Sequence, residues 1–151
     1  MERGTYINES IQQKLIDLAT ECGVEREQLV AIPCIFNYGS LLYRSIDNEE
    51  LRDRVTMLNC ELERAFLQDS FDGFIPTTEI TASREPLDDY DVFMWCDEVH
   101  IAISPYSVKT SAYYLDGTIC TDDFRYNYAN TPHFKIGQIS EESFTNLRAS
   151  K

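Results

Sequence analysis

Residues 30–42, VAIPCIFNYGSLL, join an uninterrupted apolar run to a short polar break. The run is apolar at odd and even positions alike, which predicts a strand over 30–36 buried on both faces, and Pro33 restricts that strand to a sheet edge or a late start. Glycine at position 39 would let the chain bend, so that successive backbone N–H groups point into one concavity and bind an anionic oxygen. The residues of this bend are therefore candidate substrate-binding residues: Tyr38, Gly39, Ser40 and Leu41.

Helical periodicity lies on both sides of this stretch. Between residues 7 and 22 the apolar positions recur at steps of three or four, which predicts an N-terminal amphipathic helix ending at Gly23: Ile7, Ile11, Leu15, Leu18 and Cys22. A short polar helical turn is expected at 25–29. A further helix is predicted over 47–58, because Asp47 and Glu50 have the spacing of a capping box before apolar residues that share a face.

Strand patterns dominate the rest of the chain. Residues 60–66 alternate with period two and predict a strand with one wet face. Residues 74–91 are polar and carry no clear pattern. Further strands are predicted over 99–104, 108–115, 118–121 and 133–139, with Asp116-Gly117 as the two-residue turn between the second and third, and a brief helix opens at residue 140.

This order of elements predicts an α+β fold with a mixed or antiparallel sheet, or a small barrel. At 151 residues the chain has the size of one domain. We therefore expect a single domain over 1–151, with a helical extension at 1–29, an α+β core at 30–139 and a short C-terminal helix at 140–151.

The charge balance narrows the classes of function. Thirteen basic residues stand against 26 acidic ones, a formal net charge of −13, which repels phosphate backbones and anionic membrane surfaces. Direct nucleic-acid binding is therefore not expected. The sequence has no apolar stretch that would span a membrane and no pattern of a signal peptide, so we expect a cytoplasmic protein. The five cysteines lack the paired spacing of a metal site, and we expect reduced thiols and no metal.

The string Ile35-Phe36-Asn37-Tyr38-Gly39-Ser40-Leu41 resembles the first strand and substrate loop of gamma-glutamylcyclotransferase-like proteins. In that family a later Leu-Asp-x-aromatic-Glu segment supplies the catalytic carboxylate. Leu87-Asp88-Asp89-Tyr90-Asp91 is similar to it, with Asp91 where the family has glutamate, and Glu98 is a second candidate because it directly precedes the strand at 99–104. The apolar strand that normally precedes the family's acidic segment is matched badly by residues 77–83.

The resemblance implies that a carboxylate, Asp91 or Glu98, takes a proton from the α-ammonium of a small gamma-glutamyl substrate. The freed amine then attacks the side-chain carbonyl and releases 5-oxoproline and an amine, with no metal or organic cofactor. Because aspartate is one methylene shorter than glutamate, the chain could also retain the pocket without turnover.

A second hypothesis comes from the charge alone. Acidic and aromatic residues crowd into residues 85–98, and crowded carboxylates are retained without penalty when they face water or a basic partner. The alternative function is thus a non-enzymatic acidic inhibitor or immunity-type protein that binds a basic partner protein and blocks its nucleic-acid site. The sequence leaves the identity of the substrate or partner and the oligomeric state open.

Overall fold

The computed structural model describes residues 3–30, 34–95, 98–103, 111–114, 119–120 and 132–149. Contacts within the chain divide it into a helical unit, Met1–Ser70, and a sheet unit, Phe71–Lys151. The boundary at Ser70 falls inside the stretch 30–139, which is predicted as one α+β core. Helices and an antiparallel sheet together confirm the expected α+β class.

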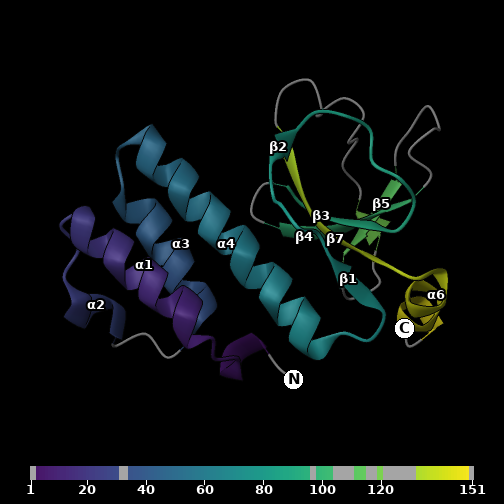
Figure 1. The fold of residues 1–151 in the computed structure, drawn as a ribbon, viewed down its shortest axis with the longest axis horizontal. Helices are drawn as coiled ribbons and strands as arrows, with labels where there is room; N and C mark the ends of the chain where they lie inside the picture. Colours follow the sequence, from purple (N-terminus) through teal and green to yellow (C-terminus); the bar gives the residue numbers. More distant parts are fainter. Residues whose placement is uncertain are drawn as a thin grey trace. The chain divides into compact units, whose positions relative to one another are not determined.

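The helical unit contains a short 3-10 turn followed by α-helices that pack side by side (Figure 1). In chain order they are η1 (Arg3–Thr5), α1 (Glu9–Glu21), α2 (Arg26–Val30), α3 (Ile35–Ser45) and α4 (Glu49–Ser70). The predicted amphipathic helix is α1, and it buries the expected face of Ile11, Leu15 and Leu18. Asn8 caps it by accepting a 3.1 Å hydrogen bond from the N–H of Ile11. Gly23 follows with a φ of +79°, a left-handed conformation that favours glycine.

The strand predicted over 30–36 is wrong where the structure describes it. Val30 ends α2, residues 31–33 lie outside the described part of the chain, and Ile35 and Phe36 open α3. This segment forms a helix because Ile35, Tyr38 and Leu42 are spaced by three and four residues, which puts them on one face against the core of the helical unit.

The strand predicted over 60–66 is also wrong, because the helix predicted over 47–58 continues as α4 to Ser70. The alternating apolar residues of this segment also fit the spacing of a helix face. Val55, Leu62 and Phe66 are seven and four residues apart, and all three are buried in the core of the helical unit. Glu63 is also buried, a position that the alternation assigns to the wet face.

The sheet unit is antiparallel throughout its described pairings. The strand order is β1-β7-β3-β4-β5-β6, and β2 also pairs with β7, so the described strands do not close into a barrel. The strands are β1 (Phe74–Pro76), β2 (Ala82–Ser83), β3 (Asp91–Trp95), β4 (Glu98–Ile103), β5 (Ser111–Tyr114), β6 (Ile119–Cys120) and β7 (His133–Ile139), followed by α6 (Glu141–Ala149).

The later strand predictions correspond to this sheet. β4 and β7 confirm the strands expected at 99–104 and 133–139, and α6 confirms the terminal helix. β5 and β6 pair antiparallel as expected of a hairpin, with Ala112 opposite Cys120, while the predicted Asp116-Gly117 turn lies outside the described residues.

The central strand β3 was not predicted. All five of its residues are buried, and it pairs with β4 on one side and β7 on the other. Phe93 lies at its middle, with the rings of His100 and His133 at centroid distances of 5.4 and 5.8 Å. The acidic and aromatic stretch at 85–98 therefore contains a strand that is buried along its whole length.

Candidate functional site

The expected substrate loop is a helix. Tyr38, Gly39, Ser40 and Leu41 all lie within α3, where backbone N–H groups donate to the carbonyl four residues earlier and do not face a concavity. Tyr38 is buried and its hydroxyl accepts a 3.3 Å hydrogen bond from Nε2 of Gln12. The backbone of Gly39 lies against the side chain of Asn59 on α4. The cradle that the sequence predicts at 38–41 is therefore incorrect, and Gly39 serves close packing of two helices instead.

The candidate base Asp91 begins β3 and is buried, with 2% of its surface exposed. Its Oδ2 accepts a 2.8 Å hydrogen bond from the N–H of Asp88, and its Oδ1 lies 3.0 Å from Nζ of Lys135 and 3.4 Å from Nε2 of Gln138. Both carboxylate oxygens are thus occupied. Through these contacts the carboxylate of Asp91 connects the turn before β3 to β7, which is a structural role.

Tyr90 shows that this turn is constrained. Its φ of +71° is unusual for a residue other than glycine. The N–H of Tyr90 donates to the carbonyl of Ala102 and its carbonyl accepts from the N–H of Ile139, which anchors the residue to β4 and to the end of β7. These two bonds and the carboxylate of Asp91 together hold the turn in place.

The second candidate, Glu98, lies at the other end of the β3–β4 pair. Glu98 is opposite Trp95 in the register, whereas Val92, the neighbour of Asp91, is opposite Ile101. The side chain of Glu98 is exposed, and its Oε2 lies 3.9 Å from Nε2 of His100. The structure therefore does not bring Asp91 and Glu98 together. Both belong to the sheet unit, whereas residues 38–41 belong to the helical unit.

Asp91 lines a hollow of about 310 Å³ on the sheet unit. Exposed carboxylates stand around it: Glu79, Glu85 and Asp88. Among the described residues that line the hollow, the single cation is Lys135, which is paired with Asp91. His133 also lines it, and burial lowers the pKa of its imidazole to about 4, so this ring is neutral at physiological pH. The hollow is therefore electrically negative.

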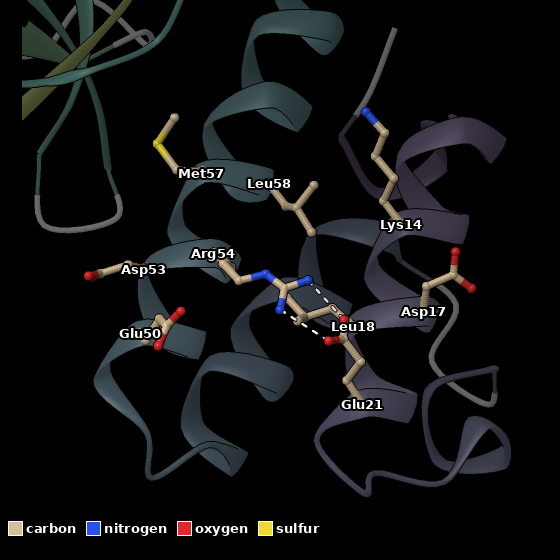
Figure 2. Close-up of a pocket in the computed structure, with 9 residues that line it drawn as sticks. All are labelled: Lys14, Asp17, Leu18, Glu21, Glu50, Asp53, Arg54, Met57 and Leu58. Atoms are coloured by element: carbon tan, nitrogen blue, oxygen red, sulfur yellow. Dashed lines mark hydrogen bonds and ion pairs between the residues drawn. The ribbon is translucent and has the colours of Figure 1, made fainter.

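A larger groove of about 570 Å³ lies on the helical unit between α1 and α4 (Figure 2). Leu18, Met57 and Leu58 supply its apolar surface. Polar and charged side chains complete it: Lys14, Asp17 and Glu21 from α1, and Glu50, Asp53 and Arg54 from α4. Arg54 forms two hydrogen bonds with Glu21, at 2.8 and 3.2 Å, and thereby links the two helices. The ion pair lowers the pKa of Glu21 and raises that of Arg54.

Sequence reasoning missed this groove, although a signal was present. On α1, Lys14, Asp17, Leu18 and Glu21 are spaced by three and four, and the same spacing relates the groove residues of α4. Acidic residues directly beside the apolar positions of both helices are the sequence signal from which a negatively charged groove could have been predicted.

No family model, curated protein or solved structure matches the chain. No helix in the described part of the chain is long and apolar enough to cross a membrane. Among the same residues, no three histidine, cysteine, aspartate or glutamate side chains gather as metal ligands would. The function is therefore argued from the two concave surfaces themselves.

Proposed function

We propose that the chain is an acidic binding protein that attaches to a basic surface of a partner protein, a surface of the kind that would otherwise hold nucleic acid. The observation that carries this proposal is the ion pair between Lys135 and Asp91. It neutralises the one cation among the described residues that line the hollow of the sheet unit. Glu79 and Glu85 line the same hollow, are exposed and form no salt bridge within the described part of the chain. Lysine and arginine side chains of a partner would balance these carboxylates.

The net charge of −13 supports the same function. A strongly negative molecule accelerates its encounter with a positive surface and repels competing anions, including nucleic acids. Because such steering is screened by salt, the association should weaken steeply as ionic strength rises.

The test is capture of a partner from a lysate of the source organism at about 50 mM and about 0.5 M salt. The bait is the wild type, the hollow variant Glu79→Gln/Glu85→Gln/Asp88→Asn, or the control variant Asp72→Asn/Glu141→Gln/Glu142→Gln. The control removes three exposed carboxylates from elsewhere in the same unit. We expect a basic protein to be retained at low salt by the wild type and the control but lost from the hollow variant. Equal capture by all three, or no capture, would overturn the proposal.

A second candidate is the cyclotransferase reaction, and the observation that favours it is the place of Asp91 in a hollow large enough for a small substrate. The substrate would then be held by hydroxyl groups of the hollow, Thr77, Thr81 and Ser83, since residues 38–41 form a helix. The full chain should be incubated with a panel of gamma-glutamyl amines and assayed for 5-oxoproline, with Asp91→Asn and Glu98→Gln as controls. Absence of product from the wild type removes this candidate.

A further inference from the structure

We propose that the groove between α1 and α4 is a docking site for an amphipathic helix of the partner protein, with an apolar stripe flanked by lysine and arginine. The inference rests on the binding function proposed above and names the form of the partner that this second surface takes. It follows from the groove's apolar content, charge and length.

The apolar surface of the groove suits the stripe of a helix. Leu18 lies deep, with 2% of its surface exposed, while Met57 and Leu58 are half-buried. Methionine is flexible and adapts its shape to different apolar neighbours, which is useful on a surface that must receive another side chain. Figure 2 shows Met57 and Leu58 on α4 and Leu18 on the facing helix.

The charges around the groove select a basic partner. Both of its cations are already engaged: Arg54 with Glu21 at 2.8 Å, and Lys14 with Glu61 at 3.8 Å. Within the described residues, the carboxylates of Asp17, Glu50 and Asp53 form no salt bridge. Flanking lysine or arginine side chains on the incoming helix would neutralise these three carboxylates, whereas an acidic segment or a phosphate backbone would be repelled.

The length of the groove fixes how much helix it can receive. Its residues run from Lys14 to Glu21 on α1 and from Glu50 to Leu58 on α4. At 1.5 Å per residue these spans are about 10–12 Å, or roughly two turns of helix. Two turns carry apolar anchors at i, i+3 or i+4, and i+7, the spacing by which a helix lies in a groove.

The ion pair between Arg54 and Glu21 prepares the groove for binding. It holds α1 and α4 in register at one end, and the contact between Lys14 and Glu61 lies between the same two helices. A groove whose walls are fixed before binding loses less conformational freedom when it is occupied.

Fluorescence anisotropy of the full chain with a labelled model peptide tests the inference. The peptide places leucines at i, i+3, i+4 and i+7 and lysine and arginine elsewhere, and a scrambled peptide of the same composition is the comparison. We expect the patterned peptide to bind about tenfold more tightly than the scrambled one. Equal binding, or none by the patterned peptide, would overturn the groove as a helix site.

Matched variants locate the site. Asp17→Lys/Asp53→Lys reverses two rim charges, and Glu141→Lys/Glu142→Lys makes the same charge change on α6. We expect the first to weaken binding of the patterned peptide about tenfold and the second less than about twofold. Circular dichroism checks that both variants remain folded. Similar weakening by both would show attraction by net charge alone and would overturn the site.

Met57→Glu separates apolar docking from charge. It adds a negative charge to a half-exposed helical position, so a purely electrostatic surface would bind the basic peptide more tightly. The groove predicts about tenfold weaker binding, because the apolar stripe loses its contact. If the groove variants fail these tests while the hollow variant still loses the captured protein, the proposed function stands without the groove.

Discussion

The guanidinium of Arg3 forms a bidentate ion pair with the carboxylate of Glu63, with N–O distances of 2.5 and 2.6 Å. Arg3 also lies over the ring of Phe36, 3.9 Å from its centroid. The side chain of Glu63 is only 7% exposed, so Arg3 is the ion-pair partner of a nearly buried carboxylate. Together these contacts fasten η1 to α3 and α4.

Replacing Arg3 by methionine should destabilise the helical unit by about 2–3 kcal/mol, because it leaves a buried carboxylate without its cation. Glu63→Gln should cost less, about 1 kcal/mol, since a neutral amide can still accept a hydrogen bond from Arg3. Urea unfolding followed by helical circular dichroism measures both. Arg3→Met with wild-type stability would mean that the pair contributes nothing.

The contact between Gly39 and Asn59 predicts a compensating pair of substitutions. A Cβ at position 39 would collide with the amide group of Asn59, so Gly39→Ala should destabilise the chain by about 1 kcal/mol. In an Asn59→Ala background the same change should become stabilising by about 0.5–1 kcal/mol, because alanine favours a helix interior over glycine. A double-mutant cycle from thermal unfolding gives the two values. Equal effects in both backgrounds would contradict this contact.

Asp91 is predicted to be structural. Asp91→Ala should cost about 3 kcal/mol, since it removes the acceptor for the N–H of Asp88 and the partner of Lys135. Asp91→Asn should cost about 1 kcal/mol, because its amide oxygen can still accept from Asp88. Trp95 is the single tryptophan of the sequence and lies in β3, so its fluorescence during urea unfolding follows the loss. Unchanged stability in Asp91→Ala would mean that these contacts do not stabilise the fold, and it would favour a catalytic role for Asp91.

His133 predicts a loss of stability in acid. Its folded-state pKa of about 4 lies below the ordinary value of 6.5. Between pH 4 and pH 6.5 the imidazole is therefore protonated in the unfolded chain but neutral in the folded chain. Stability should therefore decrease as pH falls from about 6.5 to about 4, by roughly 3 kcal/mol in total. His133→Phe should flatten this part of the pH profile of the unfolding free energy. Parallel profiles for wild type and variant would contradict the burial of a neutral imidazole.

Elements with an unambiguous period could be predicted from the sequence. The face of α1 follows from Ile11, Leu15 and Leu18, and its boundaries follow from Asn8 and Gly23. β7 and α6 were likewise visible, and so was the pairing of β5 with β6. In these segments local pattern and tertiary packing require the same structure.

The sequence was misleading where the same apolar residues fit both a buried strand and one face of a helix. Residues 35–42 are apolar enough for a buried strand, yet Ile35, Tyr38 and Leu42 also form a helical face, and packing against α1 and α4 selects the helix. The functional prediction depended on the wrong alternative, because the bend at Gly39 existed only if a strand preceded it. The sequence predicts Asp91 as a catalytic carboxylate, but its partners Lys135 and Gln138 lie far away in sequence and could not be inferred.

The position of β7 has a consequence for synthesis of the protein. β1, β2 and β3 all pair with this strand, which occupies residues 133–139 and follows all three in the sequence. The ribosome therefore completes the helical unit before the strand that unites the other half has emerged, and β3 lacks one of its two neighbours until residues 133–139 have been translated. A premature stop before His133 would leave the backbone N–H and C=O groups along one edge of β3 unpaired, and unpaired strand edges promote aggregation.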